Sequence, residues 1–550
     1  MQARVCRSEN EGLLKGAWML RARTSLSLFL LLFTIACAAQ EGNWERLVQL
    51  HEDFKVLRDA GKKDPAHDFS PSAIQSRAAQ LGKLHSRLQA ISPTGWSVAR
   101  KVDWVLVRTE LNDLDFRYRV IRPWARDPSF YVDFFRTLPF TDVPVASDKL
   151  NDFRIQIRSI PALLGQARTN LTEAGGDLTD IAIFHLVHYD GVGQGEPIRD
   201  VPPQGVVGWF EDLGSRVQRL QPDLASDVQQ ALRSIREYHD WLVRNRTKFN
   251  YSSAIGIPEY NWYIKHVRLM PYTADDLHVI ADEEASRAWT FLEIARNANR
   301  NLPELQLAKT KEEYDARVHQ AEELIRSFLA ENHLLTIPDY VGPQKTDAFW
   351  IQRPGGKRHF WEELQYRDPL VDHIHASLPG HRLDFLIHEH DTRPIRRDSE
   401  DGGRIEGWGF YCEEMLLQAG LLKDRPRVRE LFYIAQLARA MRIPVEIKIQ
   451  NGEFSMQQAI QFMVANVPFM DNNLARYDLE VYFRQPGYGM NYIAGKQQIE
   501  ELLAARAQQL GDKFDLGQFH DQFLAEGMIP VALAKWEMTG NHNDKEFDLP

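Results

Sequence analysis

Five histidines lie between positions 373 and 390, and Glu406 follows them; His375, His381 and Glu406 are the three candidates for binding a catalytic metal ion. Two imidazole nitrogens and one carboxylate oxygen can hold a zinc ion and leave its fourth position open to water. An open zinc site acts as a Lewis acid and lowers the pKa of water, which is the chemistry of hydrolysis. The residue types are therefore the raw material of a zinc site, provided that the three side chains can meet.

The spacing of the two histidines requires a distorted helix. Each helical residue turns the chain by about 100°, so side chains six positions apart lie on roughly opposite faces. Pro379 and Gly380 stand between the histidines, and such a pair commonly kinks a helix. We predict a distortion here that brings His381 beside His375. The alternative is that both are ordinary helix side chains and that Glu406, which begins an apolar helix, only complements the helix dipole.

The elements that must position these residues are mostly helices. A serine–proline pair at 70–71 predicts a helix start, a second long helix extends to about residue 121, and Thr273 with Asp276 predicts a capping box. Short extended pieces are expected at 334–337 and 348–352. No regular hairpin pattern or repeat occurs. The pattern predicts a mainly α fold with few short strands.

Composition is that of a globular protein. The chain has 550 residues, of which 44% are hydrophobic, enough for a substantial core. A formal net charge of −10 with no long basic run argues against a nucleic-acid partner. Nothing in the sequence indicates an oligomeric state. Of the cysteines Cys6, Cys37 and Cys412, only Cys412 is expected to remain after processing, as a buried apolar side chain without a disulfide.

The N-terminus has the order of a secretory signal. Arg21 and Arg23 precede an apolar run at 26–35, and small residues follow. The run is short for a membrane span, so we expect cleavage, no stable membrane span afterwards, and a periplasmic or extracellular protein. Residues 1–40 form the signal peptide and an N-terminal extension, and 41–550 form a single helical domain. A lipid anchor on Cys37 and an uncleaved membrane anchor are the alternatives.

Two motifs resemble those of a known family. Residues 375–381 read HASLPGH and residues 406–413 read EGWGFYCE, and a proline–glycine, tyrosine, glycine–lysine run follows at 486–496. This resembles a bacterial family catalogued as domain of unknown function 885, whose members look like exported zinc metallopeptidases. The family patterns are H-E-x-x-P-G-H and E-G-W-x-x-Y-x-E. The likeness extends over roughly residues 45 to 540.

The resemblance implies a large helical fold with a central groove, similar to the helical zinc peptidases. It implies that His375, His381 and Glu406 bind zinc and that the substrate is a peptide. Tyr492 would stabilise the oxyanion, since a phenol is a suitable donor. We also expect a catalytic role for Glu446 and substrate contacts from three further residues, Gln450, Trp408 and Tyr411.

The sequence departs from the family at two positions of proton chemistry. Ala376 replaces the glutamate that takes a proton from the attacking water, and Gln450 replaces a histidine. Loss of a general base costs roughly 10² to 10⁴ in rate. One alternative is a zinc protein that binds peptide without cleaving it. A second is a binding groove without metal. A third is an active enzyme whose base comes from elsewhere, for which the nearby acids are Asp384, Glu389, Glu413 and Glu414.

Overall fold

The computed structural model describes residues 43–61, 67–188, 202–344, 350–351, 354–541, 547 and 549. The expected signal segment, including Cys37, lies outside these residues. The described chain is built from helices and contains no β-strand, only an isolated bridge between Gly175 and Tyr251. The mainly α prediction is confirmed. Residues 334–337, expected as a short extended piece, lie outside the helices and pair with no strand; most of 348–352 is outside the described residues.

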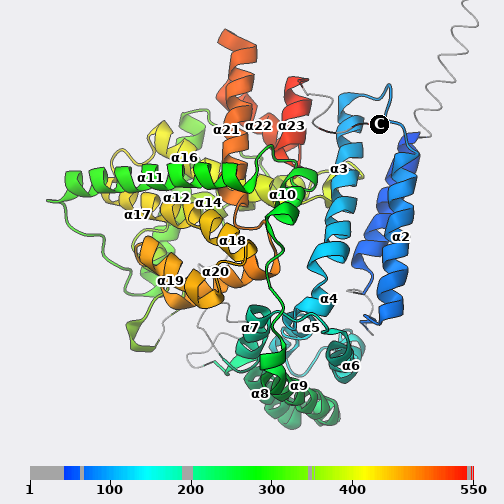
Figure 1. Ribbon diagram of the computed structural model, residues 1–550. Helices are drawn as coiled ribbons and strands as arrows, with labels where there is room; N and C mark the ends of the chain where they lie inside the picture. Colours follow the sequence, from blue (N-terminus) through cyan, green and yellow to red (C-terminus); the bar gives the residue numbers. More distant parts are fainter. Residues whose placement is uncertain are drawn as a thin grey trace, which may run out of the picture.

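The N-terminal part is a set of long helices that stands at one side of the molecule (Figure 1). It comprises a helix at 43–59, α2 (Pro71–Gln89) and α3 (Val98–Phe116). The Ser70 side chain caps α2, as the sequence predicted. The α3 helix continues as a π-helix, Arg117–Ile121, so the predicted end near residue 121 is also confirmed.

A second group of helices has a hydrophobic core of its own, drawn at the bottom of Figure 1. Its longest members are α6 and α9, which pack against each other. The core is formed by side chains such as Phe135, Leu164, Phe210 and Tyr238. The helices of this group are α4 (Pro123–Arg126), α5 (Ser129–Val132), α6 (Leu150–Asn170), α7 (Gly176–Val187), α8 (Gly205–Leu220) and α9 (Ala225–Asn245).

The remaining helices share the main core with the N-terminal set. They are α10 (Ile257–His266), α11 (Ala274–Asn299), α12 (Lys311–Glu331), α13 (Phe360–Gln365), α14 (Leu370–Ala376), α15 (His381–His388), α16 (Gly402–Ala419), α17 (Pro426–Ala440), α18 (Arg442–Gln450), α19 (Met456–Asn466), α20 (Asn472–Arg484), α21 (Asn491–Leu510), α22 (Leu516–Ala525) and α23 (Val531–Thr539). The predicted capping box of Thr273 and Asp276 begins α11.

The candidate ligands lie in the middle of this third group. The helices α16 and α21 pack closely, as do α11 and α17, while α14 and α15 lie against α16 (Figure 1). Among the described residues, no helix combines the length and the hydrophobicity needed to cross a bilayer. A cavity of about 380 Å³ separates α3 from α20 and is lined by Asp113, Arg268, Arg484 and Tyr488 among others.

Candidate metal centre

The two histidines come together because the helix between them is broken. The α14 helix ends at Ala376, directly after His375, and α15 begins at His381. A Cβ atom on Gly380 would lie 1.8 Å from the carbonyl oxygen of His375, so the turn requires glycine at this position. The ring centroids of the two histidines are 4.6 Å apart. The distortion predicted from the sequence is therefore a complete break between two short helices.

Glu406 on α16 meets both imidazoles. Its Oε2 atom lies 3.3 Å from Nε2 of His375 and 3.3 Å from Nε2 of His381. Its Oε1 atom accepts a 2.9 Å hydrogen bond from the Tyr488 hydroxyl. Burial opposes ionisation of this carboxyl group, but the two imidazoles outweigh burial and hold its pKa well below the usual range. Three candidate ligand atoms therefore converge within 4.8 Å of one another.

Glu413 fixes the orientation of the His375 ring. Its Oε1 atom lies 2.8 Å from Nδ1 of His375 and 2.8 Å from the Arg439 guanidinium, and its side chain is fully buried. A carboxylate at Nδ1 favours a proton on that atom, so Nε2 is the atom that would bind a metal ion held with Glu406. Gly409 makes room for the ring, since a Cβ atom there would lie 2.8 Å from it.

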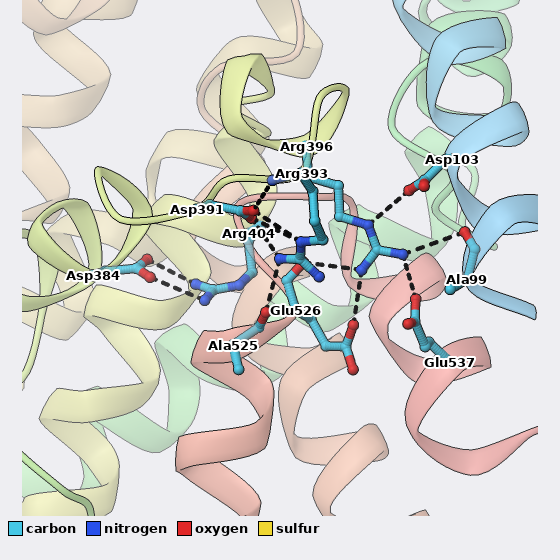
Figure 2. A network of polar contacts seen from close by, with 10 residues as sticks. All are labelled: Ala99, Asp103, Asp384, Asp391, Arg393, Arg396, Arg404, Ala525, Glu526 and Glu537. Carbon is cyan, nitrogen blue, oxygen red and sulfur yellow. Dashed lines mark hydrogen bonds and ion pairs between the residues drawn. The ribbon is translucent and has the colours of Figure 1, made fainter. Parts of the chain in front are cut away.

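A buried ion pair holds the two ligand helices in register. Arg404, two residues before Glu406, donates from both terminal nitrogens to Asp384, three residues after His381, at 2.9 and 3.1 Å. Both side chains are at most 1% exposed. Figure 2 shows this fork-like pair beside a second cluster around Arg396. Because the pair is bidentate, it fixes both the distance and the angle between α15 and α16.

The cluster around Arg396 anchors the loop that leads into α16. Its guanidinium lies 2.7 Å from Asp103 of α3, 2.9 Å from Glu526 and 2.5 Å from Glu537 of α23 (Figure 2). The Arg396 side chain is 1% exposed. Three carboxylates around one cation leave an excess of negative charge, and burial with the nearby Glu537 raises the pKa of Glu526 to about 7.

Glycines let α21 approach α16 at the level of the ligands. A Cβ atom on Gly495 would lie 2.0 Å from the Gly403 carbonyl oxygen, and one on Gly407 would lie 2.5 Å from the backbone of Gly495. Neither position tolerates a side chain at this helix separation. The close contact places Tyr492, at the start of α21, over the cavity that contains Glu406.

We call this cavity, of about 320 Å³, the site cavity. It is lined by Trp361, Asp372, His375, His381, Glu406, Arg439, Arg442, Tyr477, Asp478, Val481, Tyr482, Tyr488 and Tyr492. Burial raises the pKa of Tyr492 well above its usual value, although Arg442, 4.2 Å from the ring, opposes the shift. Burial also raises the pKa of Tyr488 to about 12. Both phenols are therefore protonated hydrogen-bond donors at neutral pH.

The other residues proposed from the sequence lie beside the site cavity or away from it. Glu446 is fully buried and accepts hydrogen bonds of 2.8 Å from the Tyr260 hydroxyl and from the Gly487 amide. It supports the loop that carries Tyr488 and does not line the cavity. Gln450 is buried too, and its amide donates to the Tyr482 carbonyl.

Trp408 and Tyr411 point away from the ligands. Trp408 is fully buried and donates from Nε1 to the Pro379 carbonyl at 2.9 Å. Tyr411 donates to Nε2 of His520, whose Nδ1 contacts the Leu334 carbonyl. Neither lines the site cavity. Both aromatic residues have packing contacts, and the substrate contacts expected of them stay a prediction.

The acids considered as substitutes for the missing base are engaged elsewhere. Asp384 pairs with Arg404, and Glu413 contacts His375. Glu414 pairs with the Arg287 guanidinium at 2.5 Å, and Glu389 is exposed at the end of α15. The sequence reasoning missed Asp372, Tyr488 and Asp478, which line the site cavity. Asp372 could have been predicted from the sequence, because it stands one helical turn before His375 and so lies on the same helix face.

A second cluster of potential ligands is already neutralised. His51, Glu52 and Asp398 could each offer an atom to one ion. However, the Lys55 ammonium lies 2.9 Å from Glu52 and 2.7 Å from Asp398, so a cation of the protein occupies the position of a metal. The cluster formed by His375, His381 and Glu406 contains no such cation. Its buried imidazole nitrogens and carboxylate oxygen suit zinc chemically.

The protein thus combines a helical fold with a partly buried cluster of two histidines and one glutamate. Residues 288–538, which carry the whole cluster, match the family model described as "Bacterial protein of unknown function (DUF885)". The expected resemblance is confirmed over these residues. No curated protein matches the chain.

Two solved structures have a similar fold. One is described as "a putative lipoprotein of unknown function from Shewanella oneidensis": it is 16% identical, with a TM-score of 0.69, over 91% of this chain and 98% of that chain. The other is described as "the putative lipoprotein from Colwellia psychrerythraea": it is 15% identical, with a TM-score of 0.70, over 91% of this chain and 99% of that chain. At these identities the likeness shows the fold alone.

Proposed function

We propose that this chain is an exported zinc hydrolase of the peptidase type. The observation that carries the proposal is the convergence of two Nε2 atoms on one carboxylate oxygen of Glu406, each at 3.3 Å. Glu413 supports it, because a carboxylate behind a ligating histidine is the usual outer partner of a zinc site. The two similar structures are described as lipoproteins, which supports export and a lipid anchor on Cys37.

The residues around the cavity suit carbonyl hydrolysis. A zinc ion bound to the three ligands would supply Lewis acidity toward the carbonyl group of a peptide. Tyr492 faces the cavity as a buried, protonated phenol and would donate to the oxygen on which negative charge develops. Arg442 lies beside that ring and pairs with Asp478 at 2.9 Å, so it fixes the wall of the cavity.

Metal content and cleavage should be measured on the same samples. We would determine zinc in the purified mature protein by mass spectrometry and screen a peptide library for cleavage. The matched variants are His381→Ala, in the cluster, and His390→Ala, an exposed histidine just after α15. We expect about one zinc per chain in the wild type and in His390→Ala, and loss of zinc and cleavage in His381→Ala. A wild type without zinc would contradict the proposal.

A zinc protein that binds peptides without cleaving them is the second candidate. It is favoured by one observation, the alanine at position 376, where a general base is expected. Stoichiometric zinc together with peptide binding and no cleavage of any library member would establish it.

A further inference from the structure

Ala376 faces a different cavity from the candidate ligands. This outer cavity, of about 700 Å³, adjoins α14 and is lined by Ala376, Ser377, Arg382 and Tyr340 among others. Alanine at position 376 leaves open the space that the carboxylate of a glutamate would occupy.

Asp372 is the one described residue that lines both the outer cavity and the site cavity. It stands four residues before Ala376 on α14, so the two side chains share one face of the helix, one turn apart. The charges of His375 and Arg439 act on its carboxyl group, which places the group within electrostatic reach of the ligand cluster. Asp372 therefore puts a carboxylate between the candidate metal centre and the space that Ala376 leaves open.

The carboxyl group of Asp372 forms no ion pair with a lysine or arginine among the described residues. Its hydrogen bond comes from the neutral amide of Gln365, which in turn accepts from the Tyr314 hydroxyl at 3.3 Å. The other acids at the site cavity are engaged: Asp478 pairs with Arg442, and Glu406 is a candidate ligand. Burial raises the pKa of Asp372, which makes it a better proton acceptor than an exposed aspartate, while His375 and Arg439 oppose the shift and Glu413 adds to it.

We propose that Asp372 is the general base of this chain and replaces the family glutamate lost at Ala376. The inference rests on the proposed peptidase function. The oxygen of a water molecule bonds to the peptide carbonyl carbon, and its proton passes to the Asp372 carboxylate. The carbon–nitrogen bond then breaks, and Asp372 returns the proton to the leaving amine. The substrate extends from the site cavity past Asp372 into the outer cavity.

The test moves the carboxylate by one helical turn. We would compare wild type, Asp372→Asn, Ala376→Glu and the double variant Asp372→Asn/Ala376→Glu, with Glu389→Gln as the control acid. Each would be assayed for kcat and KM on one cleaved peptide, for zinc content, and for the Kd of a labelled non-cleavable peptide analogue in the metal-free protein. Zinc content and thermal midpoint would report whether each variant folds.

We expect Asp372→Asn to lose roughly 10² to 10⁴ in kcat while zinc content, KM and the peptide Kd stay unchanged. The double variant should recover part of the lost kcat, and Glu389→Gln should match the wild type. Peptide binding that weakens with kcat intact would make Asp372 a specificity residue and overturn the proposal. Full activity in Asp372→Asn would overturn it as well.

The outcomes separate this inference from the proposed function. A wild type that lacks zinc and cleavage contradicts both. A wild type that binds zinc and cleaves, with an equally active Asp372→Asn, contradicts only the role of Asp372. Zinc binding without cleavage in the wild type, with cleavage gained by Ala376→Glu, would show a working metal centre in which Asp372 does not serve as the base.

Discussion

Oε1 of Glu413 lies 2.8 Å from Nδ1 of His375, and both side chains are buried. The contact sets which nitrogen of His375 carries the proton, and therefore which nitrogen is free to bind a metal. Replacing the carboxylate removes the charge that supports the imidazole and also the counter-charge of the buried Arg439 guanidinium, so both metal affinity and stability should fall.

We expect Glu413→Gln to weaken zinc binding by about 10- to 100-fold, the usual loss for an outer partner of a ligating histidine. Competition with a chelator of known affinity measures it. Glu389→Gln, which changes an exposed acid, serves as the control and should bind zinc like the wild type. An unchanged zinc affinity in Glu413→Gln would mean that His375 is not a zinc ligand or that its ring needs no carboxylate at Nδ1.

The ion pair between Asp384 and Arg404 should be important for stability. Asp384→Asn leaves a fully buried guanidinium without its counter-charge, and we expect a loss of about 3–5 kcal/mol in the free energy of unfolding. Denaturant titration of the metal-free protein measures this. The double variant Asp384→Leu/Arg404→Met should recover much of the loss, because no unpaired charge remains. A single variant as stable as the wild type would contradict the bidentate geometry.

The close contact of α16 and α21 predicts sensitivity at Gly495. Gly495→Ala would put a Cβ atom 2.0 Å from the Gly403 carbonyl oxygen, so the helices must separate. We expect a loss of about 1–3 kcal/mol in the free energy of unfolding and weaker zinc binding. Gly82→Ala is the matched control, since no atom lies within 4 Å of the new methyl group. It should be neutral or stabilising by up to about 1 kcal/mol.

Glu446 should make stability depend on pH. Burial raises its pKa to about 7, against hydrogen bonds from Tyr260 and backbone amides. A carboxyl group whose pKa is raised in the fold contributes stability that is fully present below the unfolded value of about 4.5 and is lost as pH rises through about 7. The contribution amounts to roughly 3 kcal/mol.

We therefore expect the thermal midpoint of the metal-free protein to fall between pH 5 and 8 by more in the wild type than in Glu446→Gln. At pH 5 Glu446→Gln should be about as stable as the wild type, because Glu446 is protonated there and the amide resembles the neutral acid: its oxygen can accept from Gly487 and its NH2 group can donate to the Tyr260 hydroxyl. Parallel pH profiles for the two proteins would show that Glu446 does not titrate in this range.

The helices and their starts were predictable because their signals are local. The cap at Ser70 and the capping box of Thr273 with Asp276 depend on residues within four positions of one another. The fold class followed from the same patterns. The single domain predicted for 41–550 stays a prediction, and within it the chain builds two large hydrophobic cores. This division depends on contacts between distant helices, which periodicity does not reveal.

The ligand cluster was half predictable. Residue types selected His375, His381 and Glu406, but their convergence needed the break between α14 and α15, which a kink signal alone does not specify. Their role as zinc ligands, with that of Tyr492, stays a prediction. The substrate contact expected of Trp408 also stays a prediction, and its place on the helix has a simple reason. Two residues after Glu406, its side chain points about 200° around α16 and away from the ligands. By the same rule Glu413, seven residues on, returns to the ligand face.

The ion pairs of Arg396 limit where the chain can be cut into a fragment that still folds. The segment that matches the family begins at residue 288, long after α3 in the sequence. Asp103 of α3 nevertheless supplies one of the carboxylates that hold the loop before Glu406. Tyr260, also outside the match, holds Glu446. The segment that matches the family model is therefore smaller than the part of the chain whose helices depend on one another for folding. An isolated 288–538 fragment would lose partners of two buried polar groups and with them the alignment of its own ligands.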